Sequence, residues 1–334
     1  MKTVFAVDGG GSKTDAALVR ADGSVLGFAR GPLSHSHHIG VEASVEVLDA
    51  LAVQVGTPAD LAVLFIAGLD FPDEEEAYQA EAERRGWAAE TVVGNDTYAV
   101  LRAGTERGWG VAVTCGAGIN CVGVGPDGRH ARFASLGSLS GEWGGADGVG
   151  AEALWMAARS EEARGEKTQL ERLVPEHFGL STPIELARAI HTGSVPGRRL
   201  GELAPIVFEA AETDTVARGI VERLAGEIVA FVRAAVHRLE LANEQVEVVL
   251  GGGLLQSGNQ RLLGEVETGL RGIGPRLSMT VARSRPIVGA VLLGLDRIGA
   301  ETAAYARARE ELDRATAALG SHVAGDSATV AELP

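Results

Sequence analysis

The first 31 residues combine short apolar runs with turn signals, a pattern that predicts three strands. In TDAALVRADGSVLGFA, residues 14 to 29, β-branched and apolar residues flank Asp22-Gly23, a dipeptide that favours a positive φ and a hairpin turn. A third strand follows at residues 25 to 31. The GGGSKT stretch at residues 9 to 14 is therefore predicted to be a glycine hairpin between two strands.

The pattern then changes to a mixture of helices and buried strands. Helical spacing of apolar residues covers 41 to 55, and the apolar run at 61 to 69 is typical of a buried parallel strand. An acidic helix from about 73 to 85, a short strand at 91 to 94 and a helix from about 97 to 105 follow. The alternation predicts an α/β fold.

The opening pattern returns at residues 111 to 134, VAVTCGAGINCVGVGPDGRHARFA. When Gly116 to Gly118 are placed on Gly9 to Gly11, Asp127-Gly128 falls within about two residues of Asp22-Gly23, a shift that loops absorb. An internal duplication of this kind implies two similar α/β lobes. A ligand would then lie between two opposed glycine hairpins.

Helices dominate from residue 147 to about 241, and a buried strand then ends in Gly251 to Gly253. A further strand, a break at Pro286 and an apolar helix complete the pattern, and the small, polar tail is expected to be disordered. The expected division is a first lobe of residues 1–109 with about 300–320, a second lobe of 110–299, and a tail of 321–334.

Composition narrows the class of protein. The length of 334 residues favours two domains, and no apolar run approaches a membrane span. A net charge of -15 argues against nucleic acid or an anionic membrane as partner. Two cysteines, Cys115 and Cys121, and the lack of a signal-peptide core in MKTVFAVDGG fit the cytoplasm.

The first glycine hairpin fails two nucleotide-binding motifs. Ser12 and Val7 stand where a Walker loop needs glycines, and Thr14 occupies the third glycine position of a dinucleotide fingerprint. Glycine backbone N–H groups can still cradle an anion, and the alternative is a plain tight turn. The candidate phosphate contacts of this hairpin are Gly10, Gly11, Ser12, Lys13 and Thr14.

Five motifs in order resemble the N-acetylglucosamine kinase branch of the BadF/BadG/BcrA/BcrD-type ATPase family, in the superfamily of actin, hexokinase and heat-shock chaperones. They are DGGGSKT, GNDTYAVLRAG, CGAGINC, SGEWGGADGVGAEALW and LGGGLLQSGN, spread over about residues 1 to 298. The resemblance implies two ribonuclease-H-like lobes with a central cleft, ATP and magnesium, phosphoryl transfer to the 6-hydroxyl of a small amino sugar, and a homodimer.

The resemblance assigns chemistry to two aspartates. Asp96 follows a short strand and begins a helix, which makes it the candidate base that accepts the proton of the sugar hydroxyl. The alternative is that Asn95 or Asp96 caps the helix. Asp8, at the end of the first strand, resembles the carboxylate that holds magnesium through water. Lys13 would neutralise phosphate or stand in solvent.

The second hairpin departs from the family. Ala117 and Ile119 replace two hydroxyl residues, so the backbone of Gly116 to Gly118 would carry phosphate binding, with Thr114 as partial compensation. Gly252 and Gly253 would let adenosine lie against the backbone. Gly289 would border adenine or, as the alternative, pack a helix against a neighbour.

Sugar contacts are expected from two segments. Glu142, Trp143 and Asp147 belong to the GEWGGAD stretch, where Asp147 resembles the sugar-binding aspartate or caps the helix. In GPLSHSHHIG, His35 or Ser36 stands where relatives carry an asparagine that touches the sugar. Asn95 and Asp96, farther along the chain, are expected to contact the sugar as well. A polar loop with altered substrate preference is favoured over a metal site.

N-acetylglucosamine is the expected acceptor, with glucosamine or another hexose as alternatives. A dehydratase-activating ATPase would need cysteine ligands for an iron-sulfur cluster, and both cysteines stand beside the second hairpin. A sugar-sensing regulator is disfavoured because the sequence shows no helix-turn-helix before the first strand and no basic patch.

Overall fold

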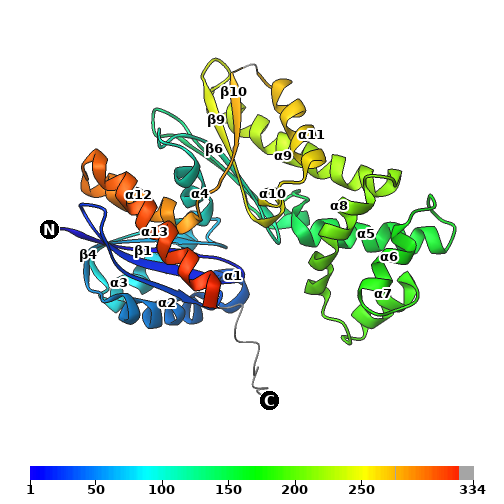
Figure 1. Cartoon of the computed structure of the whole chain (residues 1–334), viewed down its shortest axis with the longest axis horizontal. Coiled ribbons are helices and arrows are strands. Elements are labelled where there is room, and N and C mark those ends of the chain that lie inside the picture. Colours follow the sequence, from blue (N-terminus) through cyan, green and yellow to red (C-terminus); the bar gives the residue numbers. More distant parts are fainter. Residues whose placement is uncertain (275, 323–334) are drawn as a thin grey trace. The chain divides into compact units, whose positions relative to one another are not determined.

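The computed structural model describes residues 1–274 and 276–322, and the chain divides into two compact units (Figure 1). One unit contains Met1–Ala103 and the segment from Ser284 onward, and the other contains Gly104–Arg283. The return to the first unit therefore comes earlier than the expected position near residue 300. Of the expected tail, residues 323–334 lie outside the described part of the chain.

The first unit is built on a five-stranded sheet with the order β3-β2-β1-β4-β5. The hairpins of β1, β2 and β3 are antiparallel, and β4 and β5 run parallel to β1. The strands are β1 (Thr3–Gly9), β2 (Thr14–Arg20), β3 (Val25–Gly31), β4 (Ala59–Ile66) and β5 (Ala88–Asn95). The predicted glycine hairpin is confirmed, because residues 9 to 14 join β1 to β2.

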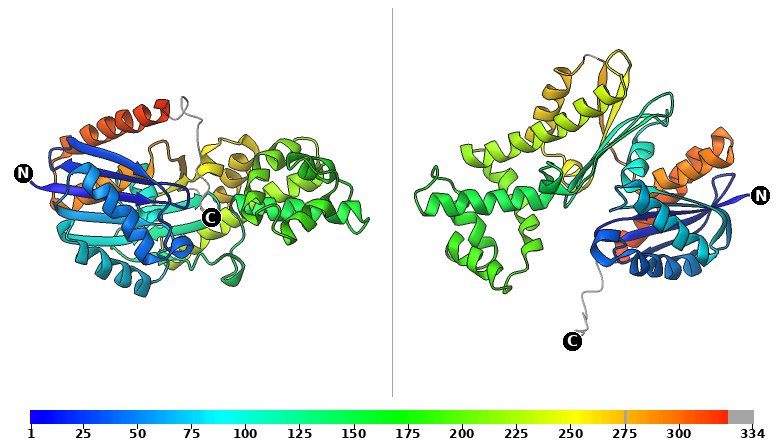
Figure 2. Two further views of the ribbon diagram at one scale, coloured as in Figure 1. Left: turned by 90° about the horizontal axis from the view of Figure 1, so that it is seen from below. Right: turned by 180° about the vertical axis from the view of Figure 1, so that it is seen from behind.

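Alternate residues of β1 face two helical layers, which Figure 2 shows on opposite sides of the sheet. Phe5 and Val7 pack in the core with α2 (Val41–Val55) and α3 (Pro72–Arg85), which follow the short helix α1 (Ser36–Ile39). Val4 and Ala6 face the helices of the other layer. These are α4 (Asp96–Gly104), α12 (Pro286–Ile298) and α13 (Thr302–His322).

Helix α12 explains the early return of the chain to the first unit. Eight of its residues are buried, among them Ile287, Val291 and Leu295. A Cβ at Gly294 would lie 2.4 Å from Cγ1 of Val4, so the helix lies directly on β1. An almost entirely apolar helix needs burial on most of its sides, and the first sheet supplies it.

The second unit repeats the topology of the first. Its sheet has the order β10-β9-β6-β7-β8, with antiparallel β6, β7 and β8 and parallel β9 and β10. Read in chain order, each strand takes the same place as its counterpart in the first sheet, which confirms the duplication. The strands are β6 (Gly110–Cys115), β7 (Ile119–Val124), β8 (His130–Arg132), β9 (Val246–Gly251) and β10 (Leu277–Val281).

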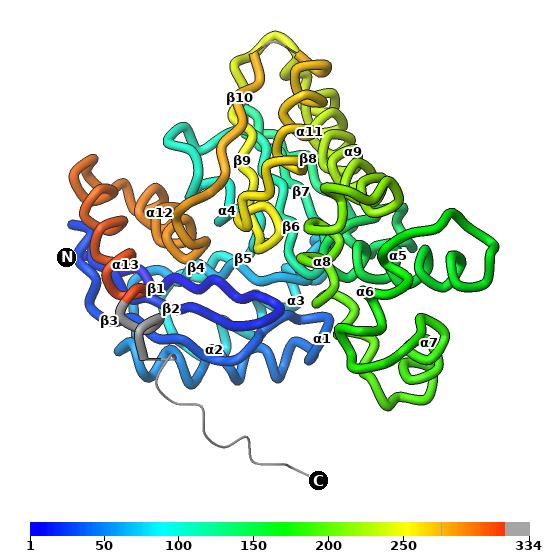
Figure 3. The backbone as a smooth tube through the Cα atoms, turned by 45° about the vertical axis from the view of Figure 1, so that its right-hand side comes forward, coloured from blue at the N-terminus to red at the C-terminus, as the bar shows by residue number. Residues whose placement is uncertain are grey.

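Helices take up the long segment between β8 and β9, as predicted (Figure 3). They are α5 (Gly145–Glu161), α6 (Leu170–His177), α7 (Pro183–His191), α8 (Ala204–Ala210) and α9 (Thr215–Arg238), with 3-10 turns η1 (Gly137–Leu139) and η2 (Gly197–Leu203). The helices α10 (Gly253–Gln256) and α11 (Gln260–Arg271) follow β9. Within the described residues, no helix is long and apolar enough to cross a membrane.

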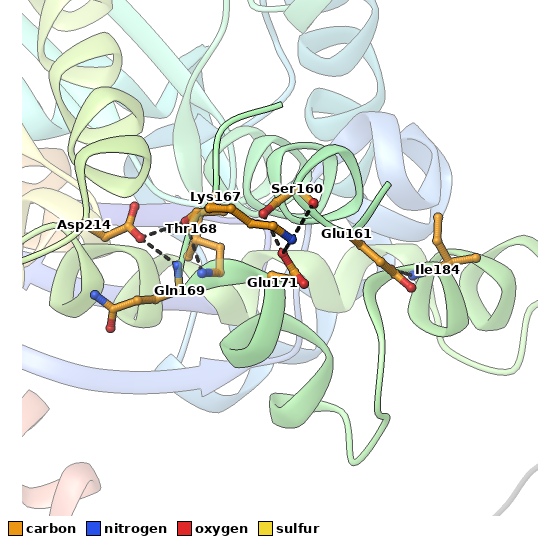
Figure 4. A network of polar contacts seen from close by, with 9 residues as sticks. Ser160, Glu161, Lys167, Thr168, Gln169, Glu171, Ile184 and Asp214 are labelled. Atoms are coloured by element: carbon orange, nitrogen blue, oxygen red, sulfur yellow. Dashed lines mark hydrogen bonds and ion pairs between the residues drawn. The ribbon is translucent and has the colours of Figure 1, made fainter. Parts of the chain in front are cut away.

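A polar network fastens the start of α6 to α5 and α9 (Figure 4). Asp214, the N-cap of α9, accepts hydrogen bonds from Thr168 Oγ1 at 2.9 Å and from the N–H of Gln169 at 2.7 Å. The Oε2 of Glu171 accepts from Ser160 Oγ and from Lys167 Nζ, at 2.6 and 2.9 Å. The helices between β8 and β9 are thus held together by polar contacts as well as by their apolar core.

Candidate functional site

Two half-buried carboxylates lie at the ends of parallel strands in the first unit. Asp8 is near the end of β1, and Asp96 begins α4 directly after β5. Burial raises the pKa of Asp96 to about 6, although the N–H groups of Thr97 and Asp96 act in the opposite direction. Burial also raises the pKa of Asp8, and the negative charges of Asp96 and Asp15 add to this effect. The two carboxylates are therefore close enough to interact.

The side chain of Asn95 holds the start of α4, where Asp96 lies. Its Oδ1 accepts a 3.0 Å hydrogen bond from the N–H of Thr97, which caps the first turn of α4. Its Nδ2 donates to the carbonyl of Leu69 at 3.2 Å and to Oδ1 of Asp70 at 2.9 Å. The Asn95 side chain thus connects the end of β5 to the β4–α3 loop, and its expected sugar contact stays a prediction.

The first glycine hairpin offers an exposed tip. The N–H of Gly10 bonds to the carbonyl of Lys13 at 3.0 Å, and Gly11, Ser12 and Lys13 are exposed. Within residues 1–274 and 276–322, the N–H groups of Gly11 and Ser12 have no hydrogen-bond partner. The positive charge of Lys13 lowers the pKa of Asp8, so its ammonium lies near that carboxylate. These groups suit an anion.

Thr14 is a structural residue of this hairpin. Its side chain is buried, and its hydroxyl lies 2.7 Å from both the carbonyl of Pro32 and the Oγ of Ser34. Gly9 leaves room for this contact, because a Cβ there would lie 2.4 Å from Ser34 Oγ. The Thr14 hydroxyl therefore fixes the hairpin to the segment after β3, and its expected phosphate contact stays a prediction.

His35 and Ser36 join the first hairpin to the loop after β4. Ser36 Oγ donates a 2.6 Å hydrogen bond to the carbonyl of Gly68, so its hydroxyl is occupied. The His35 ring stacks on His38 at 3.9 Å between ring centroids, and its Cδ2 lies 3.6 Å from the Cβ position of Gly11. Burial, helped by the neighbouring histidines, lowers the pKa of His35 to about 4. A neutral imidazole therefore borders the hairpin tip at neutral pH.

Two carbonyl groups of the second hairpin accept hydrogen bonds from the first turn of α5. The carbonyls of Gly116 and Ala117 accept hydrogen bonds from the N–H groups of Ala146 and Asp147, at 2.8 and 3.0 Å. Gly145 permits this approach, because its φ is +71° and a Cβ would lie 2.1 Å from the Ala117 carbonyl oxygen. In the described residues the N–H groups of Ala117 and Gly118 have no partner. These N–H groups are available to an anion.

Thr114 is the side-chain donor expected to compensate for Ala117 and Ile119, and that role stays a prediction. Its Oγ1 is buried and has no hydrogen-bond partner in the described part of the chain. Cys115 and Cys121 are buried beside this strand pair, as expected, and burial raises the pKa of both thiols. Phosphate binding at this hairpin would rest on backbone groups.

Side chains of the GEWGGAD stretch contact residues of the second unit. Glu142 accepts a 3.1 Å hydrogen bond from the N–H of Ser135 and a second hydrogen bond from the hydroxyl of Ser140. The guanidinium of Arg223 lies 4.0 Å from the ring centroid of Trp143 and covers one face of the indole. Asp147 lies in the first turn of α5, and its Oδ1 is near Gly201. Glu142 thus holds a loop, and the expected sugar contacts of Glu142 and Asp147 stay predictions.

The remaining candidate glycines have different roles. Gly252 has a φ of +87°, and a Cβ there would lie 2.4 Å from the Cys115 carbonyl oxygen, so it allows β9 and β6 to end close together. Gly253 has open space where a side chain would stand. A Cβ at Gly289 would lie 1.8 Å from the Ala99 carbonyl oxygen in the first unit. The structure thus supports the helix-packing alternative for Gly289.

The donor set around Asp8 fits a magnesium ion that keeps much of its water. In the described residues there is no group of three His, Cys, Asp or Glu side chains that could enclose a metal. Magnesium is commonly bound by one or two carboxylates, waters and substrate phosphates. The like charges that raise the pKa of Asp8 also make its surroundings favourable for a cation.

Sequence reasoning missed several polar residues at this edge of the first sheet. Asp70 is 8% exposed and is bound by Asn95, and Arg30 forms an ion pair with Asp15. Asp70 ends an apolar run, as Asp8 does, so its position was a usable signal. The partner of Arg30 could not be read without the strand register.

The paired sheets and glycine hairpins define an α/β protein of the actin-like ATPase and sugar kinase class. The chain belongs to the BadF/BadG/BcrA/BcrD ATPase family, whose model matches residues 6–294. It is 28% identical over 302 residues to an N-acetylmuramic acid/N-acetylglucosamine kinase of Clostridium acetobutylicum, which covers 88% of this chain and 98% of the relative.

Two further proteins extend this comparison. An N-acetyl-D-glucosamine kinase of Dictyostelium discoideum is 24% identical over 279 residues, which are 76% of this chain and 86% of the relative. A solved structure from Chromobacterium violaceum, described as a candidate N-acetylglucosamine kinase, has a TM-score of 0.67 at 25% identity. That comparison covers 88% of this chain and 99% of the other, and supports the expected fold class.

Proposed function

We propose that the protein is an ATP-dependent sugar kinase that transfers the γ-phosphoryl group to the 6-hydroxyl of N-acetylglucosamine, with Asp96 as the general base. The observation that carries the proposal is the placement of Asp96, with its raised pKa, at the same edge of the sheet as Asp8, with β4 between their two strands. Phosphoryl transfer requires in-line positioning, neutralisation of charge and a carboxylate that accepts the hydroxyl proton.

Asp96 is suited to this proton transfer. A pKa of about 6 leaves the carboxylate ionised at neutral pH yet more basic than an exposed aspartate, which favours general-base catalysis. Asn95 holds the start of α4, where Asp96 is the first residue of the helix. The Asp96 oxygen takes the proton as the sugar oxygen attacks, and the phosphoryl group leaves ADP.

Phosphate binding would rest on the two glycine hairpins. In the first unit, Lys13 and the free N–H groups at Gly11 and Ser12 are the proposed phosphate contacts. In the second unit, the proposed contacts are the free N–H groups of Ala117 and Gly118. Asp8 would hold magnesium through water, where a divalent ion supplies neutralisation of phosphate charge. Gly252 and Gly253 are the proposed contacts of adenosine.

The choice of N-acetylglucosamine is supported by the names of the two relatives. One of these relatives also acts, by its name, on N-acetylmuramic acid, which is therefore the second candidate acceptor. Glucosamine and other hexoses are the alternatives from the sequence. The proposed contacts are Asp96, Asp147 and the His35 ring.

A coupled ADP-release assay tests this proposal with N-acetylglucosamine, N-acetylmuramic acid, glucosamine, N-acetylmannosamine and glucose. We expect the highest kcat/KM for N-acetylglucosamine and a product phosphorylated at the 6-oxygen by NMR. ADP release that no sugar stimulates would contradict a kinase and would favour an ATPase or a sugar sensor. The buried, weakly acidic thiols of Cys115 and Cys121 do not favour the ATPase with an iron-sulfur cluster. A cytoplasmic homodimer stays a prediction.

A further inference from the structure

Three charged side chains form a row across the first sheet beside the glycine hairpin. Asp8 on β1 pairs with Asp15 on β2, and Asp15 pairs with Arg30 on β3. Residues directly opposite each other on antiparallel strands project from the same face, with Cβ atoms about 5 Å apart. Arg30, Asp15 and Asp8 therefore share one face.

The contact between Arg30 and Asp15 is bidentate. Nε of Arg30 donates to Oδ1 of Asp15 at 2.5 Å, and Nη2 donates to Oδ2 at 2.7 Å. Asp15 is 1% exposed, so both of its oxygens are held by one guanidinium away from solvent. This fork is the strongest geometry that an arginine and a carboxylate adopt.

Stability of the sheet is a poor explanation for this row. The next pair on the same face is Ala6 with Ala17, and Phe28 stands opposite Ala17 on β3. The neighbouring positions on this face are thus filled by apolar residues. A buried ion pair usually contributes no more stability than apolar residues of similar size would. Asp8 and Asp15 moreover oppose each other as like charges, which is unfavourable by itself.

We propose that Asp15 and Arg30 are a positioning pair that keeps the Asp8 carboxylate available for a divalent cation. Arg30 offsets the charge of Asp15, which would otherwise repel Asp8. Asp15 in turn occupies the guanidinium, which would otherwise pair with Asp8 and compete with the cation. The inference rests on the proposed function, because it assigns a purpose to the metal site of that function.

The net charge of the row in suitable variants distinguishes a positioning role of the Asp15–Arg30 pair from a purely structural role. With all three groups ionised, as they would be around a bound cation, the wild-type row carries one positive and two negative side chains, a net charge of -1. Asp15→Asn brings the net charge to zero and leaves Arg30 without its partner. The double variant Asp15→Asn/Arg30→Gln restores a net charge of -1 without the ion pair. A cation at Asp8 should therefore bind weakly to the single variant and normally to the double variant.

The experiment measures Mn²⁺ binding to the full chain with ADP present, by electron paramagnetic resonance. We expect Asp15→Asn to raise the Kd for Mn²⁺ by about tenfold, which is about 1.4 kcal/mol, and the double variant to return to within about twofold of wild type. Asp8→Asn should lose the site. Asp296→Asn is the matched control, because Asp296 accepts a second bidentate arginine fork, from Arg102, between α12 and α4.

Three results would overturn the proposal: wild-type affinity in Asp15→Asn, an equally weak double variant, or wild-type affinity in Asp8→Asn. If Asp15→Asn does not fold, the double variant alone decides, since affinity within about twofold of wild type supports the proposal and a loss beyond about fivefold overturns it. The Mn²⁺ measurement needs no turnover. A wild-type protein that binds Mn²⁺ but phosphorylates no sugar would therefore contradict the proposed function without deciding against the pair.

Discussion

The side-chain amide of Asn95 donates a 2.9 Å hydrogen bond to Oδ1 of Asp70, which ties the end of β5 to the loop after β4. The same side chain caps α4 through the N–H of Thr97. Because Asp96 is the next residue, one buried amide fixes both the helix start and the position of the proposed base. The first predictions concern these two neighbours.

Asn95→Ala should lower the free energy of unfolding by about 2 kcal/mol, because it removes a helix cap and leaves buried polar partners unpaired. We expect kcat to fall more than the ATP KM rises. Urea denaturation and steady-state kinetics measure both effects. Asn259→Ala is the control, since Asn259 Oδ1 caps α11 through the N–H of Leu262 at 2.9 Å. It should lower stability by about 1 kcal/mol and leave kcat unchanged; an equal loss of kcat there would refute a specific role for Asn95.

Asp96→Asn should keep ATP and sugar binding while kcat falls by about two to four orders of magnitude, because the amide cannot accept the hydroxyl proton. Calorimetric titration measures binding, and the coupled assay measures turnover. Asp73→Asn provides the comparison, since Asp73 is an exposed residue in the first turn of α3. Near-normal turnover in Asp96→Asn would rule out its role as base.

The pH dependence follows from the raised pKa of Asp96. The carboxylate is protonated below pH 6, so kcat/KM should fall as the pH decreases through about 6. Stability has the opposite dependence. Because the pKa is higher in the folded than in the unfolded state, the stabilising contribution is complete below the unfolded pKa of 3.8 and is lost as the pH rises through about 6.

Asp96→Asn lacks this titration, so its stability relative to wild type should increase by about 1 to 3 kcal/mol between pH 4 and pH 7. Denaturation curves for both proteins at several pH values provide the test. A constant difference across this range would show that the pKa of Asp96 is not raised by folding.

Gly145→Ala should displace the second hairpin, because the new Cβ would lie 2.1 Å from the Ala117 carbonyl oxygen at a positive φ. We expect a loss of at least about 2 kcal/mol in stability and weaker ADP binding, measured by denaturation and calorimetry. Gly226→Ala, at an exposed and open position in α9, should instead stabilise the protein by about 0.5 to 1 kcal/mol. Unchanged ADP affinity in Gly145→Ala would argue against phosphate binding at this hairpin.

His35→Asn should change the ratio of kcat/KM values between N-acetylglucosamine and the other sugars, because it replaces the neutral ring beside Gly11 with a smaller side-chain amide. The sugar panel measures this ratio. His37→Asn is the control, since the exposed His37 ring pairs with Glu74 at 2.7 Å. An unchanged ratio in His35→Asn would remove His35 from the substrate contacts.

Local patterns were sufficient for the two glycine hairpins, for helices α2 to α4 and for the duplication, but α1 and α13 were not predicted. Apolar alternation and Asp-Gly turns specify each hairpin from neighbouring residues, and the β1–β2 loop and its counterpart after β6 appear where these signals predicted them. The family and its two-sheet fold could also be inferred, because the glycine motifs and their order can be read from the sequence alone. Asp8 and Asp96 were identifiable because each stands at a strand end.

Tertiary structure decided which polar groups are free and which are already bonded. Thr14, Ser36 and Asn95 have the chemistry of ligand contacts, yet each bonds to residues that only folding brings near. The same holds for Gly289, which proved to face a helix, and for α12, which returns to the first sheet. The pairing of Arg30 with Asp15 depends on strand register. Hydrogen bonds and close packing between distant segments leave no local pattern in the sequence. The sequence by itself therefore determined the secondary-structure elements and the chemistry of their side chains, and the fold decided which groups those side chains contact.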